Sequence, residues 1–362
     1  MRSWEEKING ETEEKKMNRQ ADFTDGSSSF DDGFDKLYGK IKTMYRDDEL
    51  ETVKRAYDVA KEHHKNQPRQ SGEPYIIHPI AVASILADLG MDSQSVAAAL
   101  LHDTVEDTDV TKADIEREFG DEIAQLVDGV TKLAKVPTET KAEAQAENIR
   151  KMLLAMSNDI RVIIIKLADR LHNMRTISYV REEKRRETAL ETLEIYAPIA
   201  HRLGIRTIKE ELEDRAIICL DPVAYKEIED YLNSQSASRK EFLDSIIEKI
   251  KERVDPLVSG CKVEGRIKSV HGIYRKMYIG GKTFDEIYDI YAVRIIVESV
   301  IDCYNCLGVI HDMFRPIPNR FKDYISTPKP NMYQSLHTTL IGNNGQPFEI
   351  QIRTYEMHRT AE

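Results

Sequence analysis

Hydrophobic positions recur with a helical period through the first half of the chain. One helix face is formed by residues spaced i, i+3, i+7 and i+10, namely Leu50, Val53, Tyr57 and Ala60. A second apolar run follows Pro79, which suits the first turn of a helix, and stops at Gly90. Further amphipathic segments cover residues 94–103, 111–119, 121–134, 143–157 and 184–216. The pattern predicts an all-α first domain.

The pattern changes near residue 262, where β-branched and aromatic residues become dense. Three segments have the composition of strands, namely 289–297, 335–341 and 348–353. In the last one apolar and polar residues alternate, with Phe348, Ile350 and Ile352 set against Glu349, Gln351 and Arg353. Helical stretches at 272–278 and 302–313 separate the strands. The second half is therefore predicted to be an α+β domain with a small mixed sheet.

Four parts are expected along the chain. They are a flexible N-terminal extension (1–35), a helical domain (36–183), a connecting helical region (184–216) and a second domain (217–362). The extension is assigned because its mixed charges and its Gly-Ser run show no hydrophobic period. The polar, Pro-containing segment 135–146 is predicted to be a loop.

Composition narrows the classes of function. The formal charge of −11 argues against a protein that coats DNA, although it leaves room for a local basic pocket. Apolar runs fall well short of the ~18 residues of a membrane span, and the N-terminus is charged, so neither a membrane segment nor a secretory signal is expected. The four cysteines are too few for a disulfide framework, which favours a cytoplasmic protein with reduced thiols. Cys303 and Cys306 are interpreted as a structural pair, because no second CxxC supports a zinc ribbon.

Possible metal ligands occur at four positions of the helical half: His78, His102, Asp103 and Asp169. A divalent transition metal needs imidazole and carboxylate ligands that converge from different elements. These residues adjoin apolar runs, where an unpaired charge is costly. The alternative is that they are separate helix-end residues satisfied by caps. The crowding of His102-Asp103 with Glu106-Asp107, and of Asp169 with the polar residues that follow it, favours a metal site.

Three segments carry a resemblance to a known family. Gly72–Pro79, Leu101–Thr108 and Lys166–Thr176 resemble the HD-type hydrolase half of the RelA/SpoT homologue (Rel) family, whose members make and destroy the alarmones guanosine tetra- and pentaphosphate, (p)ppGpp. The resemblance implies that His78, His102, Asp103 and Asp169 hold Mn²⁺.

The resemblance also implies roles for residues around the metal. Glu106 and Asp107 would orient or deprotonate the water that removes the 3′-pyrophosphate. Arg69 would pack on the guanine, and Asn173 and Thr176 would touch the nucleotide.

Basic residues gather in the second half. From Lys262 to Pro330 there are 11 Lys or Arg against 8 Asp or Glu, a local charge of +3. Such a run is often only a solvated face, but Arg266 and Lys268 alternate onto one side of a strand. Asp289 and Glu349 come from neighbouring strands and could hold Mg²⁺ against phosphates. No P-loop motif is present.

Segments of this half resemble the nucleotidyltransferase-like synthetase domain of the same family, including Tyr288–Arg294, Arg320–Ile325, Asn331–His337 and Glu349–Thr354. The resemblance implies that Asp289 and Glu349 bind Mg²⁺ and that Glu349 activates the acceptor 3′-hydroxyl. Arg266 would stack on the adenine of ATP, and Tyr333 on the guanine of GDP or GTP. Phosphates would be bound by Lys268, Lys276, Arg294, Lys322 and Lys329. Transfer of the ATP pyrophosphoryl group would then rest on positioning and charge neutralisation.

The expected function is a bifunctional alarmone enzyme of the stringent response, with Mn²⁺ and Mg²⁺ as cofactors. Its expected partners are ATP, GDP or GTP, and (p)ppGpp, with no DNA or membrane, and with ribosome contact only in a full-length form. The chain is expected to be an N-terminal catalytic fragment with its synthetase domain cut short at Glu362. Two alternatives stay open. One is a nucleotide-binding regulator without turnover, and the other is an HD phosphohydrolase for other nucleotides. The intact Glu106-Asp107 and Glu349 argue against the first, and the basic second half argues against the other.

Overall fold

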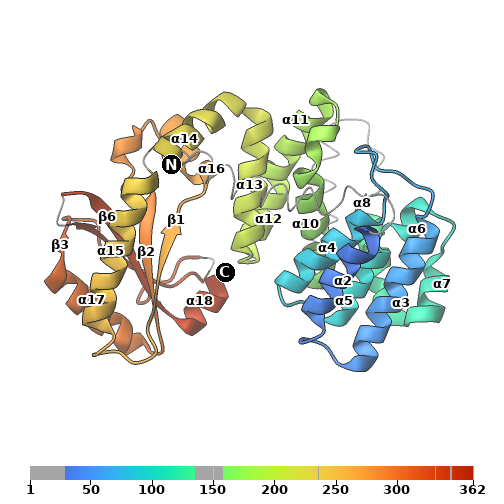
Figure 1. Cartoon of the computed structure of the whole chain (residues 1–362), viewed down its shortest axis with the longest axis horizontal. Coiled ribbons are helices and arrows are strands. Elements are labelled where there is room, and N and C mark those ends of the chain that lie inside the picture. Colours follow the sequence, from blue (N-terminus) through green and yellow to red (C-terminus); the bar gives the residue numbers. More distant parts are fainter. Residues whose placement is uncertain are drawn as a thin grey trace, which may run out of the picture. The chain divides into compact units, whose positions relative to one another are not determined.

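The structure is a computed structural model of the 362-residue chain, and it describes residues 29–134, 150, 158–234, 236–330, 332–342 and 345–361. The chain divides into two compact units, of which the first ends at Val180 and the second begins at Arg181. Figure 1 labels helices and strands of both units. Among the described helices, none combines the length and hydrophobicity that crossing a bilayer would require.

The described part of the first unit is helical throughout. Its elements are α2 (Ser29–Ile41), α3 (Asp47–His63), α4 (Ile77–Asp88), α5 (Ser93–Leu101), α6 (Thr104–Asp107), α7 (Lys112–Phe119), α8 (Asp121–Ala134), α10 (Ile160–Arg175) and the 3₁₀ turn η2 (Ile177–Tyr179). The expected apolar face of α3 is buried, with Val53 and Ala60 fully covered. Helix α5 is buried from Val96 to Leu101, so it forms the centre of this unit. The prediction of an all-α first domain is confirmed.

The flexible N-terminal extension was expected to reach residue 35, but the first described helix begins before that position. Helix α2 begins at Ser29, so the residues from 29 to 35 are helical and do not belong to an unstructured extension. Phe34, Leu37 and Ile41 have helical spacing and are all buried on one face of α2. The preceding Gly-Ser run made this short period hard to recognise in the sequence. The predicted loop at 135–146 lies outside the described residues, and so does the predicted helix at 143–157 apart from residue 150.

The second unit opens with further helices. They are α11 (Glu182–Glu191), the π-helix η3 (Thr192–Tyr196), α12 (Ala197–Arg202), α13 (Arg206–Leu220), α14 (Pro222–Ser234) and α15 (Ser236–Val254). The helices expected to connect two domains at 184–216 therefore belong to the second unit. They also do not form one rod, since Gly204 has a φ of 78° and separates α12 from α13. This left-handed backbone conformation is one that glycine adopts without strain.

A six-stranded mixed sheet forms the rest of the second unit. Its strands are β1 (Lys262–Ile267), β2 (Tyr291–Val297), β3 (Arg315–Pro316), β4 (Lys322–Asp323), β5 (Leu336–Ile341) and β6 (Pro347–Thr354), in the order β1-β2-β6-β5-β3, with β4 also paired to β5. Strands β2 and β6 run parallel, and the other pairs are antiparallel. The connections contain α16 (Val270–Tyr274), the π-helix η4 (Arg275–Ile279), the 3₁₀ turn η5 (Phe284–Glu286), α17 (Val300–Met313) and, at the end, α18 (Tyr355–Ala361). The predicted α+β domain with a mixed sheet is confirmed.

The two faces of this sheet have different surroundings. Helices α15 and α17 cover one face (Figure 1), where Phe348, Ile350 and Ile352 of β6 join the main core of the unit. Cys303 and Cys306 of α17 are buried in the same core. The alternate residues of the strands, such as Glu349 and Gln351, face the opposite side, where a cavity lies.

Asp214 of α13 is expected to make the stability of this unit depend on pH. Its Oδ1 accepts a hydrogen bond from the backbone N–H of His271 at 2.7 Å, at the start of α16. Burial raises the pKa of Asp214 to about 6. A raised carboxyl pKa means that the folded chain holds this proton more tightly than the unfolded chain, so stability falls as the pH rises from about 4 to about 6 and stays lower above that.

Asp214→Asn is therefore expected to stabilise the protein near pH 7.5 by about 1–3 kcal/mol, because the amide oxygen keeps the hydrogen bond without the buried charge. Near pH 3.5 the difference is expected to vanish. Urea unfolding of the wild type and the variant at the two pH values measures the effect. An equal difference at both pH values would contradict this account.

Candidate functional site

The predicted metal ligands of the first unit come together in the structure. His78 lies near the start of α4, His102 directly follows α5, and Asp169 lies within α10. One ligand atom from each of these three residues lies within 4.8 Å of the others, and all three side chains are buried. Asp103 is adjacent, with its Oδ1 3.1 Å from His102 Nε2 and its Oδ2 3.5 Å from His78 Nε2.

The hydrogen bonding of His102 shows that this cluster fits a cation. Its Nδ1 lies 2.8 Å from the carbonyl oxygen of Ala99, which can only accept, so Nδ1 carries the proton. In the neutral ring Nε2 then presents a lone pair, and this buried atom has no hydrogen-bond partner. It faces a carboxylate oxygen of Asp103, which also presents lone pairs. Such an arrangement is repulsive without a cation, and two imidazoles with carboxylates are a typical donor set for a divalent transition metal.

The protonation of the cluster agrees with metal binding. Burial lowers the pKa of His78, which favours the neutral imidazole that metals bind. Burial alone would raise the pKa of Asp169, but the charge of Lys166 and a hydrogen bond from His78 hold it well below its usual range. Lys166 Nζ lies 2.7 Å from Asp169 Oδ2. The cluster therefore combines a neutral ring with an anionic carboxylate.

Two residues that contact the cluster, Tyr75 and His172, were not predicted as site residues. The hydroxyl of Tyr75 lies 2.8 Å from Asp103 Oδ2 and 2.9 Å from Asp107 Oδ2, so it can donate to either carboxylate. His172 Nδ1 lies 2.7 Å from His78 Nδ1. A signal was present in the sequence, because Tyr75 precedes His78 by three positions and His172 follows Asp169 by three.

The residues expected to contact a nucleotide lie beside the cluster. Arg69 Nη2 donates to Asn173 Oδ1 at 3.0 Å, and Asn173 Nδ2 donates to Asp169 Oδ1 at 2.6 Å. Thr176 follows the last residue of α10 and donates to the carbonyl oxygen of His172. Glu106 and Asp107 are exposed on α6, directly after Asp103.

The second unit has a cavity of about 1010 Å³ on the polar face of its sheet. Its lining is strongly basic, with ten Lys or Arg residues, namely Arg206, Lys209, Arg266, Lys268, Arg275, Lys276, Lys282, Arg320, Lys322 and Lys329. Five acidic residues also line it, namely Glu210, Glu213, Glu286, Asp289 and Glu349. The volume and the excess of cations suit large, phosphate-rich ligands.

Two carboxylates in this cavity lie at neighbouring strands, with Glu349 on β6 as predicted and Asp289 two residues before the start of β2. Asp289 precedes β2 and lies 2.8 Å from Lys268 Nζ and 2.7 Å from Lys276 Nζ. Glu349 pairs in register with Ala292 of β2, and its Oε1 lies 3.2 Å from His337 Nδ1. Burial would raise the pKa of each carboxyl, but the lysines at Asp289 and the hydrogen bond from His337 at Glu349 lower it. Both groups are therefore anionic.

The other predicted residues of the second unit divide into two sets. Arg266, Lys268, Lys276, Lys322, Lys329 and Tyr333 line the cavity. Lys329 Nζ lies 5.0 Å from the centre of the Tyr333 ring, and the Tyr333 hydroxyl lies 2.8 Å from His337 Nε2. Arg294 is not among the lining residues. It is buried on β2 and donates to Glu264 Oε1 on β1 at 3.0 Å.

The fold and the sites define a class of protein, in which an all-α domain with a buried cluster of His and Asp side chains precedes an α+β domain with a large basic cavity. Residues 56–206 match the family described as "HD domain", and residues 265–362 match the family described as "Region found in RelA / SpoT proteins".

Similar proteins share both halves. The chain is 52% identical over 313 residues to a GTP pyrophosphokinase of Streptomyces coelicolor, with 86% of this chain and 37% of that protein covered. It is 49% identical over 329 residues to the bifunctional (p)ppGpp synthase/hydrolase SpoT of Escherichia coli strain K12, with 91% and 47% covered. It is 48% identical over 329 residues to a guanosine-3′,5′-bis(diphosphate) 3′-pyrophosphohydrolase of Vibrio cholerae, again with 91% and 47% covered. The chain belongs to the RelA/SpoT family, and it spans less than half of the length of these relatives.

Proposed function

We propose that the chain is a bifunctional alarmone enzyme that hydrolyses the 3′-pyrophosphate of (p)ppGpp and transfers pyrophosphate from ATP to the 3′-hydroxyl of GDP or GTP. The observation that carries the proposal is the buried cluster of His78, His102 and Asp169 within the HD match, with Asp103 beside it. The basic cavity with Asp289 and Glu349 supports the second activity. Both reactions use nucleotides of the cytoplasm, which is the proposed location.

In the hydrolase half, His78, His102, Asp103 and Asp169 would hold a divalent metal, which we propose to be Mn²⁺. Such an ion lowers the pKa of water and neutralises phosphate charge. Asp107 and the neighbouring Glu106 would take the proton of the attacking water. The Tyr75 hydroxyl lies 2.9 Å from Asp107 Oδ2 and can fix the position of this carboxylate. Arg69 would stack on the guanine, and Asn173 and Thr176 would contact the nucleotide.

In the synthetase half, Asp289 and Glu349 would hold Mg²⁺, and Glu349 would accept the proton of the acceptor 3′-hydroxyl. Lys268, Lys276, Lys322 and Lys329 would neutralise the phosphates, Arg266 would stack on adenine and Tyr333 on guanine. Arg294 of β2 pairs with Glu264 of β1. We therefore propose that Arg294 fixes these two strands relative to each other and does not contact phosphate directly. A role in the stringent response follows from the proposed substrates, and ribosome contact is proposed only for longer forms.

Two incubations of the purified chain test the proposal. With Mn²⁺ and guanosine tetraphosphate, we expect GDP and pyrophosphate. With Mg²⁺, ATP and GDP, we expect AMP and guanosine tetraphosphate. A chain that binds guanine nucleotides but catalyses neither reaction would support the alternative of a regulator without turnover.

Tyr333→Ala is expected to weaken GDP binding for synthesis, because stacking of a base on an aromatic ring contributes about 1–3 kcal/mol. Hydrolysis should stay near the wild-type rate, since the cluster that we propose for it lies in the first unit. The KM for GDP and the hydrolysis rate measure the two effects. Tyr304→Ala is a matched control, because this exposed tyrosine of α17 is not among the cavity residues. Equal loss of both activities in folded Tyr333→Ala protein would contradict separate sites.

A further inference from the structure

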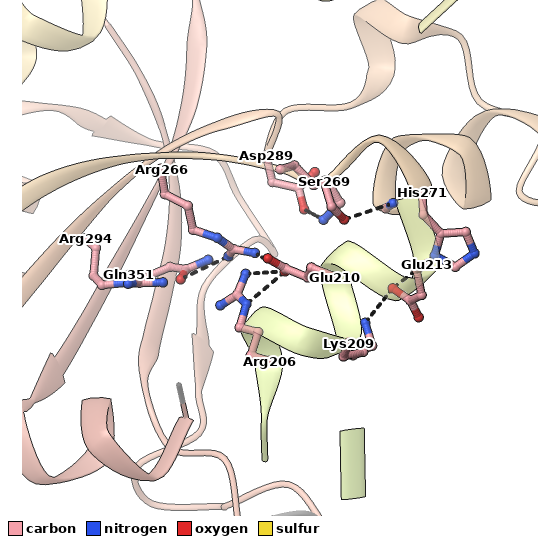
Figure 2. Close-up of polar contacts among 12 residues, drawn as sticks. Arg206, Lys209, Glu210, Glu213, Arg266, Ser269, His271, Asp289, Arg294 and Gln351 are labelled. Atoms are coloured by element: carbon pink, nitrogen blue, oxygen red, sulfur yellow. Dashed lines mark hydrogen bonds and ion pairs between the residues drawn. The ribbon is translucent and has the colours of Figure 1, made fainter. Parts of the chain in front are cut away.

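Helix α13 contributes to the synthetase cavity although it lies almost wholly between the two family matches, which end at residue 206 and begin at residue 265. Arg206, Lys209, Glu210 and Glu213 of this helix line the cavity (Figure 2). None of them was predicted from the sequence, so their role in the site is open.

Glu210 contacts two guanidinium groups at once. Its Oε1 accepts from Arg206 at 2.8 Å (Nε) and 2.7 Å (Nη2), and it lies 3.2 Å from Arg266 Nη2 on β1. On the other side, Arg266 Nη1 lies 3.5 Å from Gln351 Oε1, at the outer limit of a hydrogen bond. Gln351 Nε2 donates to Glu349 Oε1 at 2.8 Å. Figure 2 shows this line of contacts from α13 across β1 to β6.

The contacts of Arg266 use the edge of its guanidinium group. A guanidinium is planar and its N–H donors all lie in that plane, so partners at the edge leave the two faces available for stacking on a ring. Without such partners, a long arginine side chain samples many rotamers. The entropic cost of fixing one rotamer then reduces the affinity for the ligand. Glu210 is the ionic partner of Arg266 among the described contacts, and Arg206 offsets its negative charge within the basic cavity.

We propose that Glu210 is a positioning residue, which fixes the Arg266 guanidinium so that one face is ready to stack on the adenine of ATP. The inference rests on the proposed synthetase function. It makes α13, a helix outside the matched synthetase region, part of the donor-nucleotide site.

Glu210→Gln tests the proposal, because the amide keeps the size of the side chain and loses its charge. We expect the KM for ATP to rise about tenfold, because the loss of one hydrogen bond between charged groups changes affinity by about that factor. The KM for GDP should change little. Calorimetric titration with α,β-methylene-ATP, which cannot donate the pyrophosphoryl group, should show the same loss of affinity. In an Arg266→Ala background, Glu210→Gln should have no further effect, because Glu210 acts through Arg266.

Glu211→Gln is the matched control, because Glu211 pairs with Arg215 at 3.2 Å on the same helix and does not line the cavity. Unchanged or tighter binding of the ATP analogue to Glu210→Gln would overturn the inference, and so would an equal loss of ATP and GDP binding with a lower melting temperature. Wild-type protein that binds no ATP analogue would overturn the proposed synthetase function as well. Wild-type binding with an unaffected variant would overturn only the role of Glu210.

Discussion

Asp103→Ala is expected to abolish hydrolysis of guanosine tetraphosphate and to weaken Mn²⁺ binding strongly. Asp103 presents its carboxylate oxygens to the Nε2 atoms of both His102 and His78, so its loss removes a charge that stabilises a bound cation. Changing even the outer partners of a metal site typically costs about 10–100-fold, and removal of a direct ligand should cost more than ~100-fold. Release of pyrophosphate and electron paramagnetic resonance titration with Mn²⁺ measure the two effects.

Asp88→Ala provides a control for this variant. Asp88 is an exposed residue at the end of α4 that pairs with Lys40, so its loss should leave both metal binding and hydrolysis unchanged. Wild-type protein treated with a chelator should lose hydrolysis and regain it when Mn²⁺ is added. Hydrolysis at the wild-type rate by Asp103→Ala, or by metal-free protein, would show that the cluster is not the hydrolytic site.

Glu349→Gln is expected to lower the rate of synthesis by about 10²–10⁴-fold, the usual contribution of a positioned general base. The amide has nearly the shape of the carboxylate but cannot take the proton of the 3′-hydroxyl. It also presents less charge to a metal held with Asp289. Synthesis under saturating ATP and GDP, where kcat is measured, separates this effect from weaker binding.

Hydrolysis by Glu349→Gln should remain near the wild-type rate, which serves as an internal check on folding. Glu356→Gln on α18 is a control that lies near in sequence but is exposed and not among the cavity residues. Synthesis by Glu349→Gln within a few-fold of the wild type would rule out Glu349 as the base.

The features that could be predicted from the sequence are those with a local signal. The apolar period of α3 and the alternation in β6 depend on neighbours within a few positions. The apolar residues of both elements are buried as expected, although Gln351 and Arg353 on the polar face of β6 are buried as well. The convergence of His78, His102 and Asp169 was predictable because each of them adjoins a buried apolar run, where a polar side chain needs a partner.

The features that could not be predicted depend on packing between distant segments. Glu210 and Arg266 are 56 positions apart, and no local pattern indicates that α13 reaches β1. Arg294 has the charge and the strand position of a phosphate-binding residue. Its pairing with Glu264 depends on the register of β1 against β2, which only the folded sheet sets.

The strand order of the sheet has a consequence for synthesis of the chain on the ribosome. Strand β6, which carries Glu349, follows the other described strands along the chain but occupies the position between β2 and β5. The sheet therefore has a gap at its middle until residues 347–354 have emerged, and its parallel β2–β6 pairing closes a long loop. The helices of the first unit need no such late segment and can pack as they emerge. During translation, the helices that carry His78, His102 and Asp169 can thus pack before the cavity of the second unit can form.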